Sequence, residues 1–109
     1  MAALIFRKGA YYPGVTQSIT TSGSSQSFAP FSANVAIVRV ATSQDIFLQV
    51  GVSPVATTSS MLLPGGAIEF FAVEPGQSVA VLQITTAGIV TVTELVWLFI
   101  YALAEIWEA

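Results

Sequence analysis

The sequence feature that most constrains the fold of this chain is a series of short apolar runs separated by turn-forming residues. The runs are rich in β-branched and aromatic residues, and several alternate apolar side chains with polar or small ones. They occupy residues 34–40, 46–52, 67–73, 78–84 and 89–94. Turn segments such as "LLPGG", "EPGQ" and "TTAG" separate them. Strands at a spacing of roughly ten residues with such punctuation are typical of sandwiches and barrels. We predict an all-β fold, a β-sandwich of jelly-roll-like or immunoglobulin-like type.

Part of the interior and one turn of this sandwich follow from the same pattern. Core positions are expected in strands that alternate or are apolar throughout, and the candidates are Leu48, Val50, Phe70, Val81 and Leu82. The dipeptide at residues 75–76, Pro-Gly, matches the centre of a type II turn. Proline fixes its own φ, and glycine accepts the positive φ that must follow.

Three regions are expected along the chain. The N-terminal segment, residues 1–32, contains "GVTQSITT", which we expect to be an ordered strand. It also contains a Ser/Thr-rich stretch at residues 22–27 that is typical of a flexible loop. Residues 33–94 are expected to form the sandwich core, and residues 95–109 a C-terminal apolar helix. Apolar residues precede the first cations in "MAALIFRKGA", the reverse of a secretory signal, so we expect no signal peptide.

The helix is predicted from the periodicity of the closing stretch, "LVWLFIYALAEIWEA". At about 100° per residue, Glu94, Tyr101, Glu105 and Glu108 fall within one stripe, which we expect to face water. The rest of the circumference is apolar and supplies the candidate assembly interface. Its residues are Leu95, Trp97, Leu98, Phe99, Ile100, Leu103, Ile106 and Trp107.

Three roles are open for this segment. A helix that is apolar over most of its circumference is normally buried in protein. Because a small β-domain covers only one side of it, packing against other copies is the leading interpretation, and burial within the same chain is the second. Membrane contact is the third and is disfavoured. The apolar run at residues 95–104 is half of the roughly 20 residues that a span needs, and the polar stripe is acidic rather than basic.

The sequence offers few residues for catalysis or metal binding. It contains no His and no Cys, which excludes the usual triads, disulfides and the common metal sites. Paired carboxylates suit glycoside hydrolysis, and Asp45, Glu69 and Glu74 are the candidates outside the C-terminal segment. Each has a simpler interpretation: Asp45 and Glu74 lie at expected turns, and Glu69 is in mid-strand where it can face solvent. We therefore predict no enzyme activity, no metal and no cofactor.

The charge balance argues for protein partners rather than nucleic acid. Charged residues make up 8% of the chain and hydrophobic residues 54%, and the net charge is −3. The cations are Arg7, Lys8 and Arg39, which are too few to neutralise a row of phosphates. Arg39 is expected to pair with a carboxylate at the sheet edge or to reach a neighbouring subunit. A surface this poor in charge is weakly protected against association, so we predict a homo-oligomer.

An ordered set of motifs at residues 38–40, 47–51, 58–66 and 75–82, with "YYPGVTQSI" near the start, carries a resemblance. It resembles small structural proteins encoded among the virion genes of tailed bacteriophages. In that family a strand with a "VRV" core is followed by a strand containing Phe and Gly, a "TS-x-M-x-LP-x-G" segment, and a Pro-Gly turn before a hydrophobic strand. The matching segments here are residues 38–40, 47–51, 58–66 and 75–82. The resemblance covers residues 12–95 and includes "YYPGVTQSI" near the start. The apolar segment after Leu95 departs from the pattern.

The resemblance implies a β-sandwich component of the virion, assembled in the host cytoplasm. The expected role is capsid decoration, cement or minor capsid protein, with the major capsid protein or neighbouring virion proteins as partners. One alternative is a tail- or fibre-associated module that binds host-surface carbohydrate, for which Tyr11 and Tyr12 are candidate contacts. Another is a membrane-associated virion component anchored by the C-terminal helix.

Overall fold

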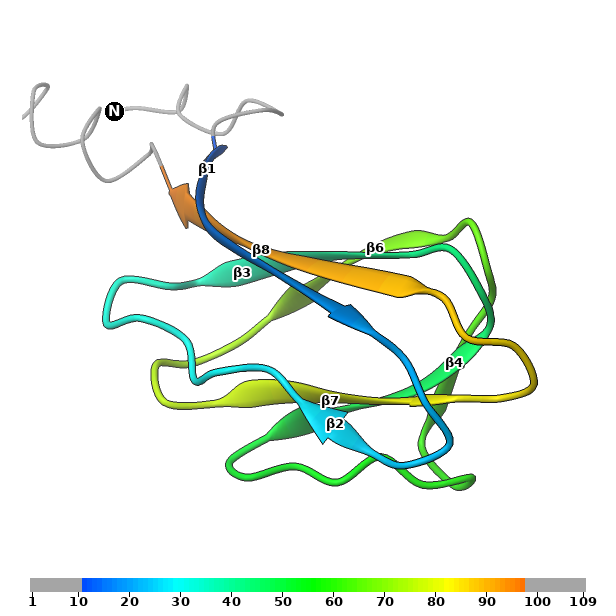
Figure 1. The fold of residues 1–109 in the computed structure, drawn as a ribbon. Helices are drawn as coiled ribbons and strands as arrows, with labels where there is room; N and C mark the ends of the chain where they lie inside the picture. The colour runs from blue at the N-terminus through cyan, green and yellow to red at the C-terminus, as the bar shows by residue number, and fades with distance from the viewer. Residues whose placement is uncertain (1–10, 98–109) are drawn as a thin grey trace, which may run out of the picture.

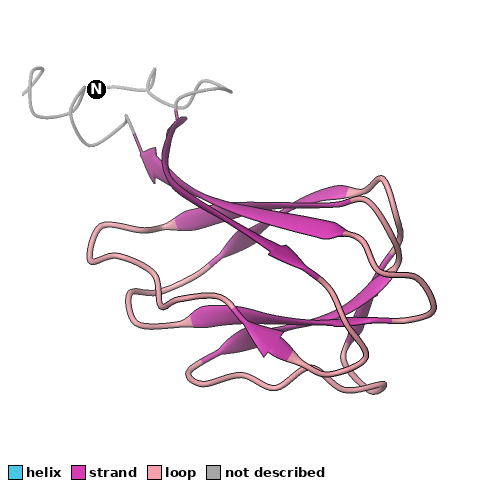
Figure 2. Cartoon of the chain, viewed as in Figure 1, coloured by secondary structure: helices cyan, strands magenta, loops and turns pink. Residues whose placement is uncertain are grey.

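The computed structural model describes residues 11–97, and this range consists of strands and connecting loops (Figures 1 and 2). No helix occurs within it, so the prediction of an all-β fold is confirmed for this part of the chain. The strands are β1 (Tyr11–Thr20), β2 (Gln26–Ser27), β3 (Ile37–Thr42), β4 (Ile46–Gly51), β5 (Met61–Leu63), β6 (Ile68–Ala72), β7 (Ser78–Gln83) and β8 (Ile89–Trp97).

Two four-stranded antiparallel sheets form the two layers of a sandwich (Figure 1). Sheet A has the order β1-β8-β3-β6, and sheet B has the order β2-β7-β4-β5. Each strand of the first half pairs with its counterpart from the second half: β1 with β8, β2 with β7, β3 with β6 and β4 with β5. The chain is therefore arranged as one long hairpin folded over itself, and the pairings β3–β8 and β4–β7 close the two sheets.

The core lies between the sheets and is mainly aliphatic, with Phe28 and Phe31 as its buried aromatic residues. Alternate residues of each strand face inward, as the two-residue repeat of a strand requires. The largest fully buried side chains come equally from the two sheets: Val38, Val40, Val90 and Val92 from sheet A, and Ile46, Leu48, Val79 and Val81 from sheet B. Burying a side chain of this kind contributes about 1.5–3 kcal/mol. This shared layer is the main source of stability.

The core prediction is correct in part. Leu48 and Val81 are fully buried, Val50 packs against the core, and Leu82 is half-buried on the outer side of sheet B. Phe70 is 57% exposed, so its assignment to the core is wrong. The reason is its position on β6, a strand at the edge of sheet A, where it lies opposite Arg39 on the outer face.

The sandwich is larger than the expected range of residues 33–94. β1 is an ordered strand, as predicted, and it pairs with β8 along sheet A. β2 lies at the end of the Ser/Thr-rich stretch and pairs with β7. The N-terminal segment is thus part of both sheets from residue 11 onward.

The predicted helix is wrong at its start. Leu95 and Trp97 lie in β8, where Leu95 pairs with Pro13 on one side and with Ile37 on the other. Backbone pairing, with two neighbouring strands at Leu95 and with β1 at Trp97, outweighs the helical periodicity of the sequence at these residues. Residues 98–109 lie outside the described range. Glu94, which was expected to face water, is 5% exposed and points into the sandwich in line with Val38.

Turn chemistry behaves as the sequence predicts. Gly76 has a φ of 86°, and Gln77 N donates to Glu74 O at 3.1 Å, which closes the turn around Pro75. A similar turn precedes β6, where Gly66 has a φ of 84° and Ala67 N donates to Pro64 O at 3.1 Å. Both conformations favour glycine because a Cβ is strained at positive φ.

Candidate assembly surface

The predicted assembly interface falls only partly within the described residues. Leu95 is 8% exposed and faces outward from sheet A between Pro13 and Ile37. It is already covered, so it is not an open contact residue. The backbone of Trp97 pairs with Tyr11 at the end of the β1–β8 ribbon. The remaining candidates lie beyond residue 97: Leu98, Phe99, Ile100, Leu103, Ile106 and Trp107.

The outer face of sheet A becomes more exposed from its centre toward β6. One row across the face comprises Thr16, Thr93, Arg39 and Phe70, contributed by β1, β8, β3 and β6. The hydroxyls of Thr16 and Thr93 are hydrogen-bonded at 3.1 Å, and Thr93 is buried. At the far end of the row Phe70 is exposed, and in the next row Ile68 is 48% exposed. Exposed apolar side chains of this face therefore lie on β6, at Ile68 and Phe70, and at the start of β8, where Ile89 is 54% exposed.

The backbone of β6 is bonded to β3 at every second residue. Val73 N donates to Ala36 O at 3.0 Å, and Thr42 N donates to Ala67 O at 3.3 Å. Because hydrogen-bonded and non-hydrogen-bonded pairs alternate in an antiparallel ladder, residues 69 and 71 also turn their backbone groups toward β3. The N–H and C=O groups of Ile68, Phe70 and Ala72 consequently point away from the sheet. Among the strands of residues 11–97, none pairs with this edge, and the side chains of these three residues lie on the outer face.

The other strand edges are shorter or interrupted. The register of β1 shifts between Pro13 and Thr16, and Pro13 has no N–H to offer. The side chain of Gln17 on β1 is tied to the backbone of Ala29, accepting at 2.8 Å and donating at 3.3 Å. β2 has two residues and β5 has three. Within residues 11–97, β6 is the edge with the fewest of the features that normally prevent strand pairing.

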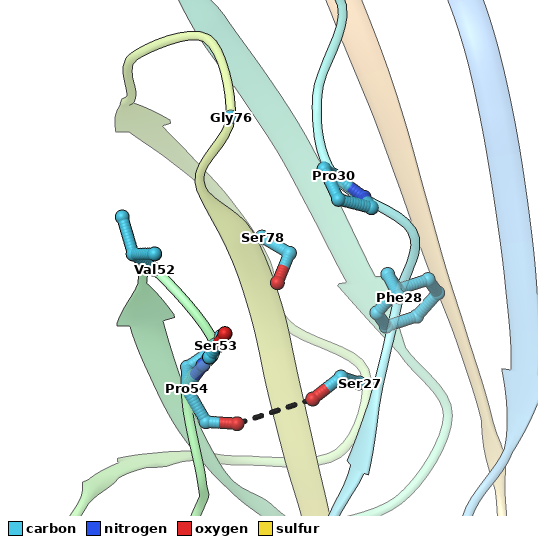
Figure 3. A pocket seen from close by; sticks show the side chains of 8 residues that line it. All are labelled: Ser27, Phe28, Pro30, Val52, Ser53, Pro54, Gly76 and Ser78. Carbon is cyan, nitrogen blue, oxygen red and sulfur yellow. Dashed lines mark hydrogen bonds between the residues drawn. The ribbon is translucent and has the colours of Figure 1, made fainter.

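The part of the outer face of sheet B that lies over β7 is covered by the chain's own β4–β5 connection, whereas Leu62 on β5 remains exposed. Ser27 Oγ donates to Pro54 O at 3.1 Å, and Ala56 N donates to Ser25 Oγ at 2.9 Å. The bond from Ser27 to Pro54 passes over β7, as Figure 3 shows. Beneath it, Ala80 is 0% exposed although it faces away from the core. The connection makes sheet B buried on both sides at this point.

A hollow of about 340 Å³ lies beside this connection (Figure 3). Serine hydroxyls and proline rings form much of its wall, and no charged side chain lines it; the residues are Ser27, Phe28, Pro30, Val52, Ser53, Pro54, Gly76 and Ser78. Its aromatic residue, Phe28, is buried rather than displayed. Tyr11 and Tyr12, the sequence candidates for carbohydrate contact, are not among the lining residues. The hollow offers hydroxyls for hydrogen bonding and no stacking platform.

The carboxylates have structural partners or lie apart from one another. Asp45 Oδ1 accepts a hydrogen bond from Gly65 N at 2.7 Å, and Glu74 lies at the opposite end of β6. Glu69 is exposed on β6 between them. Glu94 Oε2 accepts a hydrogen bond from Ser32 N at 3.1 Å and thereby holds the β2–β3 connection. In residues 11–97 no three metal-ligating side chains cluster.

Arg39 is not placed beside a carboxylate of the same face. Its direct cross-strand neighbours are Phe70 on β6 and Thr93 on β8. Glu69, the carboxylate at this sheet edge, lies opposite Val40 and therefore belongs to the other face. The expected pairing of Arg39 with an edge carboxylate does not occur through direct register.

Comparison with protein-family models, with curated proteins and with solved structures finds no match to this chain. Among residues 11–97, no helical segment has the length and apolar character required to cross a lipid bilayer.

Proposed function

We propose that this chain is a non-enzymatic structural protein of a tailed-bacteriophage virion, acting as a capsid decoration, cement or minor capsid protein. The observation that carries the proposal is the pairing of first strand with last, second with seventh, third with sixth and fourth with fifth. This order supports assignment of the sandwich to the jelly-roll type. Eight-stranded jelly rolls recur in viral capsid and lectin domains. The step from fold to function is an analogy, and the motif resemblance to phage virion proteins supports it.

The residue chemistry supports an assembly role. The sequence lacks His and Cys, and the described carboxylates Asp45 and Glu94 hold loops in place. Exposed apolar side chains occur on several elements, among them Ile68, Phe70 and Leu62. Residues 98–104 add a continuous apolar stretch directly after β8. Such surfaces gain free energy when a partner removes them from water.

Binding to particles tests the virion role. Particles assembled without this chain should bind the purified protein until a fixed number of copies per capsid is reached, and electron microscopy should place those copies at symmetry-related positions. Saturable binding is expected because each capsid offers a finite set of equivalent sites. Binding that never saturates, or that is equal on unrelated particles, would contradict the role.

The C-terminal residues are proposed to contribute to that binding. Truncation must follow Trp97, because a cut after Glu94 removes three residues of β8 and damages sheet A. The protein shortened to residue 97 should stay folded by far-ultraviolet circular dichroism and lose particle binding. Leu103→Asp should weaken binding at least tenfold, whereas Tyr101→Asp, on the predicted polar stripe, should have little effect. Equal effects of the two substitutions would contradict the predicted apolar face, and flotation with liposomes only by the full-length chain would favour the membrane alternative.

The hydroxyl-lined hollow favours carbohydrate binding as a second candidate function. A tail- or fibre-associated module of this kind would use the hollow beside Ser53, whose φ of 50° is unusual for a residue other than glycine. Glycan-array binding that disappears in Ser78→Val, with the fold retained, would favour this function. Absence of binding to host-surface glycans at millimolar concentration would remove it.

A further inference from the structure

We infer that two copies of this chain associate through β6, edge to edge and antiparallel, so that their two A sheets become one continuous sheet. The inference concerns a surface other than the C-terminal residues and does not depend on the virion role. It rests on the unpaired backbone groups of Ile68, Phe70 and Ala72 and on the exposed side chains beside them.

The edge is complementary to itself under two-fold symmetry. If Phe70 of one copy lies opposite Phe70 of the other, Ile68 lies opposite Ala72, and Ala72 lies opposite Ile68. These are the residues whose N–H and C=O groups point away from β3, so each group meets a group of the opposite kind. If the register shifted by one residue, the outward-pointing N–H and C=O groups of one copy would face residues of the other copy whose N–H and C=O groups are already bonded to β3. The backbone therefore excludes every register of the wrong parity. Among the registers that remain, the one centred on Phe70 is the one that matches all three outward-pointing residues with one another.

Side-chain chemistry agrees with that register. Phe70 meets its symmetry mate on the outer face, and aromatic cross-strand pairs are among the more stabilising ones. The charge on β6, Glu69, lies opposite Phe71 of the other copy rather than opposite its own equivalent. No like charges are directly apposed along the strand. The edge also lacks the proline, lysine and bulge that normally block such pairing, and Glu69 on its inner face is the one protective charge on β6.

A second copy fits this edge better than an unrelated peptide because the same strand supplies both halves of the match. An arbitrary extended peptide would satisfy the backbone groups, but nothing in it would place an aromatic side chain against Phe70. The joined sheet would have eight strands, in the order β1-β8-β3-β6 from one copy and then β6-β3-β8-β1 from the other. Such an interface is isologous and closes as a dimer.

Single cysteines test the register because the natural chain has none. In the proposed dimer the two Cα atoms of residue 70 are about 5.5 Å apart, within the range over which a disulfide forms. Phe70→Cys should therefore form a disulfide dimer under mild oxidation. Ile68→Cys alone and Ala72→Cys alone should not, because each lies about 13 Å along the strand from its own equivalent. A mixture of those two variants should yield the mixed dimer.

Phe70→Pro tests the backbone part of the inference in the full-length chain. Proline removes an N–H that points away from β3, so the fold should be retained, as edge positions of this kind tolerate proline. The dimer dissociation constant measured by sedimentation should rise at least tenfold. Val55→Pro is the matched control in an exposed loop and should leave that constant unchanged. Self-linking of Ile68→Cys as fast as Phe70→Cys, or undiminished association of a folded Phe70→Pro, would overturn the inference.

Discussion

The two sheets of this sandwich have four strands each, yet the chain covers their outer faces to different extents. Over β7, sheet B is covered by the β4–β5 connection, which is held by Ser25 and Ser27 and buries Ala80 completely. Within residues 11–97, sheet A has no such cover at β6, where Ile68 and Phe70 are exposed. This difference shows that the alternation of residues along a strand predicts which face of the sheet a side chain points to, but not whether that side chain is buried. Whether an outward side chain is buried depends on what the rest of the chain, or a partner, places over it.

The largest difference in the free energy of unfolding should come from substituting aspartate for one alanine on the outer face of each sheet. Ala80→Asp in sheet B should reduce the free energy of unfolding by several kcal/mol, because it buries an unpaired carboxylate beneath the connection. Ala72→Asp faces outward at the edge of sheet A and, in protein dilute enough to be monomeric, should change the free energy of unfolding by less than about 0.5 kcal/mol. Urea unfolding of both variants measures the difference. Similar values for the two would remove the distinction between the sheets.

The stability of sheet A should nevertheless be sensitive to substitution of Glu94 on its inner side. Glu94→Ala removes the acceptor for Ser32 N and should cost about 1–3 kcal/mol, since a part-buried hydrogen bond to a carboxyl group is lost. Glu94→Gln keeps an acceptor oxygen and should cost less. The two variants can be compared by thermal unfolding at one pH. A larger loss in Glu94→Gln than in Glu94→Ala would mean that the hydrogen bond is not what this residue contributes.

Removing the hydrogen bonds that hold the β4–β5 connection over sheet B should have smaller effects on stability. Ser25→Ala and Ser27→Ala each remove one hydrogen bond to the β4–β5 connection and should cost about 1 kcal/mol apiece. Ser59→Ala, at an exposed serine of the same connection, serves as the control and should be close to neutral. Faster amide exchange across residues 52–60 in the first two variants should accompany the loss of stability.

Much of the fold was predictable from the sequence because strands and turns are encoded locally. The all-β class and the Pro75-Gly76 turn follow from strand patterns and from turn residues, and a strand was expected at "GVTQSITT", within which most of β1 lies. The long-range order of strands does not follow, because pairing depends on which faces meet after collapse. The end of β8 was mispredicted for a similar reason: a helical period at Leu95 says nothing of the two strands that flank it.

The candidate surface was predicted less well than the fold. Sequence reasoning assigned assembly to the apolar C-terminal residues and placed Phe70 in the core. The available signal was "IEFF", in which adjacent aromatic residues must face opposite sides of a strand. Such a pair shows that both faces are apolar, but only the sheet order reveals that β6 is an edge. The unpaired backbone groups have no sequence signal at all.

Residue-resolved amide hydrogen exchange at low and high protein concentration tests most directly whether β6 is the open edge that a second copy closes. The amides of Glu69 and Phe71 are bonded within sheet A and should exchange slowly at both concentrations. Those of Ile68, Phe70 and Ala72 should exchange rapidly when the protein is dilute and become protected as concentration rises. Loss of this alternation, or association that leaves these three amides unprotected, would contradict the account.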